Sequence, residues 1–249
     1  MNRLLLLLLS IVLAVSAFAA EPRRYAAMSL IGDQMELVVA RMQTGSNVPA
    51  NAREVVPFPD PALDRFILRT IDRIVAAETR GEGVTMLAAR DPRLYALQES
   101  LLSQDASVEN LLAAVKTVVS NQKATHLILV TRYRHEALLR SDDGIVGSGR
   151  LSGIGFYVDH VRPMRRDRLE QSIGFLAPYT YFQVLIVDLD TLRIVRSETA
   201  MGSRVHVPPV SGSVVHPWET MDDAGKVEAL QSLLREELER VLPPLLKVG

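Results

Sequence analysis

The residues best suited to chemistry form a group in the middle of the chain: His135, Asp142, Asp143, Asp159 and His160. Imidazole nitrogens and carboxylate oxygens are metal ligands, and a metal held by them could activate water for hydrolysis. The group flanks a possible hairpin, which would bring its two halves together. A simpler interpretation makes the two adjacent aspartates a turn and the histidines polar residues at strand ends. The sequence therefore predicts no catalytic or metal-binding residue, and a metal-assisted hydrolase stays the alternative.

Motifs that would hold a cofactor are incomplete. Gly147-Ser148-Gly149 superficially suggests a dinucleotide-binding loop, but such a loop follows a strand and opens a helix, whereas this one precedes a strand-like segment. Residues 224–227 lack the first glycine and the Ser/Thr of a phosphate-binding loop, and no Gly-x-Ser-x-Gly nucleophile motif is present. We expect no cofactor.

The densest basic stretch contains Arg162, Arg165, Arg166 and Arg168. Guanidinium groups at this density could contact an acidic protein surface or anionic lipid headgroups. The alternative is a solvated loop or short helix whose charge is partly neutralised by neighbouring acidic residues. No aromatic residues are interleaved with the arginines, so we expect no nucleic-acid binding.

Two long irregular segments, residues 44–59 and 202–218, are further candidates for contact with a partner. Loops longer than about 12–15 residues are often functional or disordered. The second segment contains Pro208 and Pro209, which favour extended backbone that could lie in a groove. It ends at Trp218, the single tryptophan, which could fix the final helix in place or anchor a partner.

The first residues have the order of a secretory signal peptide. A single positive charge, Arg3, precedes an apolar run over residues 4–15, and Ala17-Phe18-Ala19 fits a cleavage site. The apolar run is shorter than the roughly 20 residues that cross a hydrocarbon core, which disfavours an uncleaved anchor. We therefore predict a signal peptide over residues 1–19 and a single exported domain over residues 20–249, without an integral membrane span after cleavage.

Composition agrees with an exported domain held together by packing. The 249 residues include 28 basic and 29 acidic ones, and loss of Arg3 with the leader barely changes this balance. Such a chain has no strong overall field toward nucleic acid. It contains no cysteine, which excludes disulfides and the usual bacterial lipid attachment. A bacterial periplasm is the compartment that we expect if the source is Gram-negative.

Hydrophobic patterning predicts a mixed α/β fold, a central mixed sheet with a late antiparallel hairpin covered by about four helices. We expect the first two strands, residues 25–31 and 35–42, to form a hairpin around residues 32–34. The other expected strands are residues 84–88, 126–133, 150–158, 179–187 and 192–198, of which the last two form the late hairpin.

Helix starts are marked by capping residues. Asp60-Pro61 begins a helix that ends near residue 81, and a second Asp-Pro pair opens one over residues 93–102. A third helix is expected over residues 107–122. The final helix is expected to begin near Thr220, to carry an apolar stripe toward the core or a partner, and to stop at Pro243.

This order of elements resembles the small periplasmic α/β domains of the TolB amino-terminal and CsgG type. The resemblance rests on the opening strand pair, the strand over residues 124–133, and the late hairpin over residues 184–195 with Asp188 at its turn. It implies a domain that supports envelope assembly or protein contact and performs no chemistry. The absence of a lipidation cysteine departs from the CsgG pattern, and no functional residues can be carried over.

Taken together, the sequence favours an exported, non-enzymatic α/β protein that binds or helps assemble another envelope component. The predicted contact residues are Arg162, Arg165, Arg166, Arg168 and Trp218, and the partner is expected to be an envelope protein.

Overall fold

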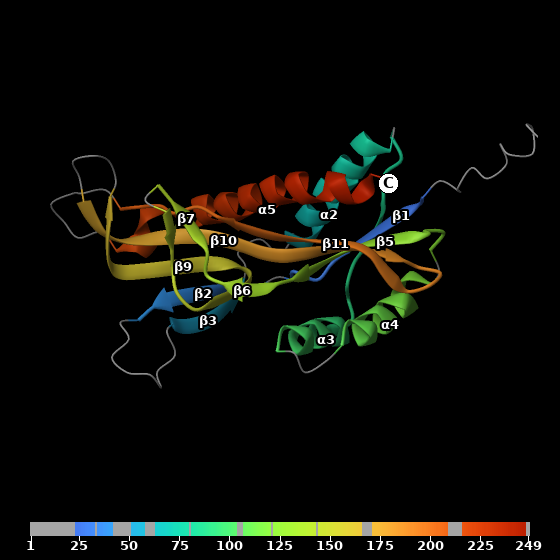
Figure 1. The fold of residues 1–249 in the computed structure, drawn as a ribbon, viewed down its shortest axis with the longest axis horizontal. Helices are drawn as coiled ribbons and strands as arrows, with labels where there is room; N and C mark the ends of the chain where they lie inside the picture. The colour runs from blue at the N-terminus through green and yellow to red at the C-terminus, as the bar shows by residue number, and fades with distance from the viewer. Residues whose placement is uncertain are drawn as a thin grey trace, which may run out of the picture.

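The computed structural model in Figure 1 describes most of the chain beyond residue 22. The described ranges are 23–32, 34–41, 51–57, 63–79, 81–103, 107–120, 122–142, 144–165, 171–208 and 216–247. The predicted leader over residues 1–19 and the predicted helix start at Asp60-Pro61 lie outside these ranges.

Strands and helices alternate through the first half of the chain, and long strands follow. The elements are β1 (Tyr25–Ser29), β2 (Gln34–Ala40), β3 (Asn51–Pro57), α2 (Leu63–Glu78), β4 (Thr85–Leu87), α3 (Pro92–Leu102), α4 (Val108–Val119), β5 (His126–Arg132), β6 (Arg134–Glu136), β7 (Leu139–Ser141), β8 (Gly144–Val146), β9 (Arg150–Arg165), β10 (Gln171–Asp188), β11 (Arg193–Ser203), the 3-10 helix η2 (Pro217–Thr220) and α5 (Asp223–Leu246).

A nine-stranded mixed sheet forms the centre of the molecule. Its main path is β3-β2-β9-β10-β5-β1-β4, with β11 on β10 and β6 on β9. The pairs β1–β4, β1–β5 and β2–β9 are parallel, and the other pairs are antiparallel. Four α-helices of the described chain cover this sheet, so the predicted mixed α/β class is confirmed.

Strand β10 joins the two halves of the sheet. Its residues 171–181 pair with β9 and its residues 182–188 pair with β5, while β11 runs along the opposite edge. The predicted late hairpin, β10–β11, is confirmed. Asp188 closes it, because its Oδ1 accepts hydrogen bonds from the backbone N–H groups of Asp190 at 3.1 Å and Thr191 at 2.8 Å.

Helices cover both faces of the sheet, as Figure 1 shows with α2 and α5 on one side and α3 and α4 on the other. The buried side chains of β5 alternate between the two layers. Ile128 and Val130 pack with α2 and α5, whereas Leu127 and Leu129 pack with α3 and α4. This burial on both faces explains the continuous apolar run of β5 in the sequence.

A third core cluster lies under the β7–β8 hairpin and is rich in tyrosine. The Tyr181 hydroxyl accepts the backbone N–H of Leu138 at 2.8 Å, and the Tyr157 hydroxyl accepts that of Ser148 at 3.1 Å. Burial raises the pKa of both tyrosines. The neutral hydroxyls therefore hold both ends of the segment that contains this hairpin.

The predicted opening hairpin is wrong. β1 pairs with β4 and β5, both in parallel, whereas β2 pairs with β3 and β9. Gly32 has a φ of +84°, and the chain leaves β1 here and enters a different half of the sheet. All five residues of β1 are buried, and two strands from later in the sequence bury them more completely than a local hairpin would.

The segment over residues 44–59 is also not wholly irregular, because residues 51–57 form the edge strand β3. Its side chains are mostly exposed and include Arg53, whose Nη1 lies 2.9 Å from Glu36 Oε2 on β2. An edge strand that pairs on one side needs few apolar residues, so its sequence carried little strand signal.

The final helix starts later than predicted. Asp222, rather than Thr220, is its N-cap and accepts the backbone N–H of Gly225 at 2.8 Å. Thr220 instead ends η2, where its hydroxyl donates to the Pro217 carbonyl at 2.6 Å. The first turn is thus capped by a carboxylate, which also suits the helix dipole.

The predicted stop at Pro243 is wrong as well, because α5 runs through Pro243 and Pro244 to Leu246. Leu245 and Leu246 are buried in the core beside α2, and this burial favours continuation of the helix. Arg196 on β11 donates to the carbonyl oxygens of Pro244 and Lys247 near the helix end. No helix in the described ranges is long and apolar enough to cross a membrane.

Candidate functional site

The histidine and aspartate group predicted as a possible metal site is spread along the sheet. His135 lies on β6 opposite Leu151, near the start of β9, and Asp142 lies in the turn between β7 and β8. Asp159 lies eight positions beyond Leu151, roughly 26 Å along an extended strand. Asp143 lies outside the described residues. Within those residues no group of three or more potential ligands could hold a metal ion.

His160 contacts a different histidine. Its ring centroid lies 4.4 Å from that of His216, whose Nδ1 accepts the backbone N–H of Trp218 at 3.3 Å. Burial lowers the pKa of His160, and the charge of His216 lowers it further. The neutral form of the His160 imidazole is thus favoured at this contact between β9 and η2.

Asp159 supports a bulge in β9. Three residues of β9, 160–162, stand opposite the single residue Gly174 of β10. Asp159 Oδ1 accepts the backbone N–H of Arg162 at 2.9 Å, which satisfies a donor in the bulge. Gly174 has a φ of +81°, and a Cβ there would lie 2.4 Å from the Asp159 carbonyl oxygen. The bulge thus requires glycine on the β10 side.

The bulge contains the first of the predicted contact arginines, and the strand continues beyond it. Arg162, whose side chain is exposed, and Arg165 belong to β9, and Arg165 pairs with Gln171 of β10. The prediction of a loop or short helix is therefore wrong for these two positions. Arg166 and Arg168 follow in the chain and lie outside the described residues. We call Arg162, Arg165, Arg166 and Arg168 the basic arm.

Trp218 lies in η2 and packs between β9 and the final helix. Its ring meets Phe156 of β9 edge-on, with centroids 5.4 Å apart, and Lys226 Nζ of α5 lies 4.0 Å from the ring centroid. The side chain is partly buried against the core. These contacts correspond to the alternative in which Trp218 fixes the final helix in place.

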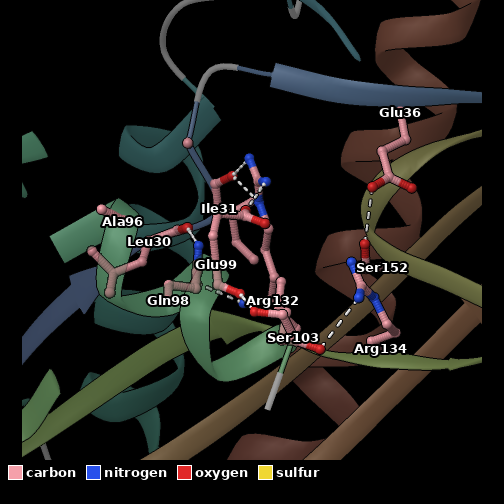
Figure 2. Close-up of polar contacts among 12 residues, drawn as sticks. Leu30, Ile31, Glu36, Ala96, Gln98, Glu99, Ser103, Arg132, Arg134 and Ser152 are labelled. Carbon is pink, nitrogen blue, oxygen red and sulfur yellow. Dashed lines mark hydrogen bonds and ion pairs between the residues drawn. The ribbon is translucent and has the colours of Figure 1, made fainter. Parts of the chain in front are cut away.

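A polar cluster around Glu36 fixes β2 against its neighbours. Its carboxylate accepts hydrogen bonds from Ser152 Oγ at 3.0 Å, shown in Figure 2, and from the buried Tyr179 hydroxyl at 3.3 Å. Burial and the nearby Glu36 carboxylate raise the pKa of Tyr179 well above its usual range. Gly155 permits this approach, because a Cβ there would lie 2.0 Å from the Glu36 carbonyl oxygen.

Two hollows lie where three parallel strands end. β1, β4 and β5 all terminate at this edge of the sheet, and α2 and α3 begin close to it. Crevices outside the carboxyl ends of parallel strands are the usual ligand sites of open α/β sheets. Arg132, the last residue of β5, lies between two hollows here, of about 410 Å³ and 510 Å³.

Arg132 is fixed by backbone and side-chain contacts, as Figure 2 shows. Its Nε and Nη2 donate to the Ile31 carbonyl at 3.1 and 3.0 Å, and its Nη1 lies 2.8 Å from Glu99 Oε1. Gln98 binds the backbone on both sides: its Oε1 accepts the N–H of Arg132 and its Nε2 donates to the Leu30 carbonyl. These contacts hold α3 against the ends of β1 and β5.

Asp64, at the start of α2, also connects helices to the strand ends, and it lines the larger hollow. Its Oδ1 accepts the Ser29 hydroxyl at 2.5 Å and the backbone N–H of Gly32 at 3.2 Å. Its Oδ2 accepts the Tyr95 hydroxyl at 3.3 Å. Asp64 thus connects the end of β1 to α2 and α3.

The smaller hollow, which we call the strand-end cleft, lies between the sheet and the α3–α4 pair. Residues of β5 and β10 form its floor, residues of α3 and α4 form its wall, and arginines from β5, β6 and β9 line its polar side. The lining residues used below are Leu101, Val108, Leu111, Thr131, Arg132, Arg134, Arg150, Gln183 and Leu185.

Sequence reasoning missed this cleft. Its residues come from six elements that lie between positions 98 and 185, and no short motif joins them. The sequence signal for the cleft was the presence of polar residues in apolar strands. Thr131 and Arg132 end the apolar run of β5, and Gln183 interrupts an apolar run on β10. Without the parallel pairing of β1 with β5, that signal could not be placed at a shared sheet edge.

Compared with known proteins, the chain matches no protein-family model and no curated protein. Among solved structures it is similar to a neuraminyllactose-binding hemagglutinin homologue from Helicobacter pylori, at 8% identity and a TM-score of 0.40, over 90% of this chain and 86% of that one. A Xanthomonas campestris protein of the family designated DUF330 is similar at 12% identity and a TM-score of 0.35, over 93% and 87% of the two chains. At these TM-scores and identities, neither a fold nor a function can be assigned to this chain from the two structures. The resemblance to the TolB amino-terminal domain and CsgG is not confirmed.

Proposed function

We propose that this chain is an exported, non-enzymatic protein that binds or helps assemble another envelope component, and that the basic arm is its docking surface. The observation that carries the proposal is the position of Arg162, together with the spacing of the arm in the sequence. Arg162 is exposed in the bulge opposite Gly174, near the end of the β9–β10 hairpin, and the other three arginines follow in sequence within six residues. A partner can reach this end without disturbing the strand-end cleft.

The chemistry of the arm favours an acidic protein surface as partner. Arginine presents a planar fork of donors that matches carboxylates, and it holds its charge at every physiological pH. Complementary charge of this kind speeds association and excludes wrong partners. Because the chain as a whole is nearly neutral, attraction would be local to the arm rather than a property of the entire surface.

The separation of the predicted chemical group supports binding over hydrolysis. A metal-assisted hydrolase would need His135, Asp142 and Asp159 within a few ångströms of one another. Asp159 instead accepts the backbone N–H of Arg162 in the bulge where the basic arm begins, and His160 contacts His216. We therefore assign Asp159, His160 and Trp218 to support of the arm.

Crosslinked pull-down from the native envelope tests this proposal. The informative variant is Arg165→Glu/Arg166→Glu, and the matched control is Arg69→Glu/Arg193→Glu, which reverses two exposed arginines on α2 and β11. We expect the arm variant to reduce recovery of one discrete partner at least about tenfold, or about 1.4 kcal/mol, and the control to leave it unchanged. Equal recovery with both variants would eliminate the arm as the docking surface.

Export is a separate part of the proposal with its own test. Expression of the entire chain in a Gram-negative host should yield a periplasmic product whose first residue is Ala20. Replacing Ala19 with a bulky residue should block processing, because signal peptidase accepts small side chains at this position. A cytoplasmic product that retains Met1 would contradict export.

A further inference from the structure

The strand-end cleft contains polar side chains to which the described residues offer no side-chain hydrogen bond. Gln183 of β10 and Thr131 of β5 are cross-strand neighbours on the floor of the cleft. Within the described part of the chain, neither the Thr131 hydroxyl nor the Gln183 amide makes a side-chain hydrogen bond. Thr131 is buried and Gln183 is partly buried, and polar groups in such places usually meet a protein group, water or a ligand.

Among the arginines that line the cleft, Arg134 has guanidinium N–H donors that remain available to a ligand. Arg132 is committed to Ile31 and Glu99, and Arg150 Nε lies 3.1 Å from Glu136 Oε1. Arg134 contacts only a carbonyl oxygen, that of Leu102 at 3.3 Å, and no carboxylate of the described residues lies within ion-pair distance. Its guanidinium therefore carries a positive charge that no carboxylate of the described chain pairs with.

The opposite side of the cleft is apolar. Leu101 on α3 and Val108 and Leu111 on α4 face the sheet, where Leu185 continues the floor beyond Gln183. The volume of about 410 Å³ lies in the range of small-molecule sites. A ligand that fills it must present a polar end to one side and an aliphatic surface to the other.

We propose that the strand-end cleft binds a small anionic amphiphile, a carboxylate on an aliphatic chain. The carboxylate accepts hydrogen bonds from the Arg134 guanidinium, the Gln183 amide and the Thr131 hydroxyl. The chain packs against the leucines and valine of the α3–α4 wall. Because a carboxylate has two oxygens with several acceptor positions, it can satisfy all three donors at once.

This binding is independent of the proposed docking function. The cleft contains Arg150 at the start of β9, and the basic arm begins twelve residues later at Arg162, roughly 40 Å along an extended strand. Substitutions in one region therefore leave the other region intact. Failure of amphiphile binding would not affect partner recovery through the arm.

Titration of purified protein with octanoate, followed by calorimetry, tests the proposal. Acetate supplies the same head without the chain, and octyl glucoside supplies the same chain with an uncharged head. We expect saturable binding of octanoate at one site and binding at least about tenfold weaker for each of the other probes. A negative heat-capacity change should accompany burial of the chain.

Two variants locate the site, and a third controls for charge. Arg134→Gln and Gln183→Leu should each weaken octanoate binding, the first by about tenfold or more, since hydrogen bonds to charged groups are the stronger ones. Arg193→Gln removes an exposed arginine of β11 outside the cleft and should change nothing. Unchanged melting temperatures would show that all three variants fold.

Three results would overturn the proposal. Octyl glucoside that binds as tightly as octanoate would mean that the cleft recognises only an aliphatic chain. Octanoate binding that survives Arg134→Gln would place the ligand elsewhere on the protein. Absence of saturable octanoate binding to the folded protein would show that the cleft does not take this class of ligand.

Discussion

The Oε1 atom of Gln98 accepts the backbone N–H of Arg132 at 2.9 Å, and the same buried side chain donates to the Leu30 carbonyl. One amide on α3 thus connects the ends of two parallel strands that are about 100 residues apart in sequence. It bonds there to the backbone just past β1 and at the last residue of β5. Gln98 also lines the strand-end cleft at this edge.

Replacing Gln98 with leucine should therefore destabilise the protein by about 2–5 kcal/mol, because two buried backbone groups would lose their partners. Urea unfolding measures the change. Gln183→Leu is the matched control, since that amide has no described partner and its loss should cost less than about 1 kcal/mol. Equal losses for both variants would contradict the structural role of Gln98.

The glycine at the β9–β10 bulge gives a second prediction. Gly174→Ala places a Cβ against the Asp159 carbonyl in a backbone conformation with φ of +81°, so it should destabilise the fold and weaken partner binding through the arm. Gly144→Ala is the control, because Gly144 also has positive φ but open space around it. The control should lose only the cost of the conformation, about 1–2 kcal/mol. A Gly174→Ala loss no larger than this would contradict the tight contact.

Stability should fall as the pH drops from about 7.5 to 5.5. Burial lowers the pKa of His126, His160 and His206 in the folded state, so the unfolded chain binds more protons as the pH falls through about 6.5. His206 is informative because its Nε2 is buried without a partner in the described chain, and a proton there would have no acceptor.

Urea unfolding at the two pH values, for the wild type and for His206→Gln, measures this dependence. The introduced glutamine side chain does not titrate, so the variant should lose part of the pH dependence even if it is less stable overall. Stability that rises on acidification, or a slope unchanged in the variant, would contradict the assignment.

The sequence predicted the positions of strands and helices better than it predicted which strands pair. Residues 25–31 and 126–133 were both expected as strands, but their parallel pairing depends on contacts between segments about 100 residues apart, which no local pattern records. Gly32 suggested a local hairpin because it follows an apolar run, although it marks the exit from β1 toward another part of the sheet. The helix start at Asp91 was predicted correctly because capping is local, and the start near Ser107 followed from the apolar periodicity of that helix.

The basic arm and the strand-end cleft show the same contrast between local sequence signals and contacts between distant segments. Arg162 and Arg165 could be identified as a basic stretch, since clustering of charge is visible in sequence, but their place on a strand could not. The strand-end cleft could not be predicted, because Gln183 and Thr131 meet only through antiparallel pairing of β10 with β5. Pro243 suggested a helix stop, and burial of Leu245 and Leu246 outweighed that local signal.

Site-specific photocrosslinking in the native envelope tests the docking function most directly. A photoreactive residue in place of Arg162 reports contacts of the arm, and one in place of Arg193 reports contacts of β11 as the control. We predict one discrete protein crosslinked from position 162, absent from position 193, and lost when Arg165→Glu/Arg166→Glu is added. The same products from both positions, or no product from position 162, would contradict docking through the basic arm.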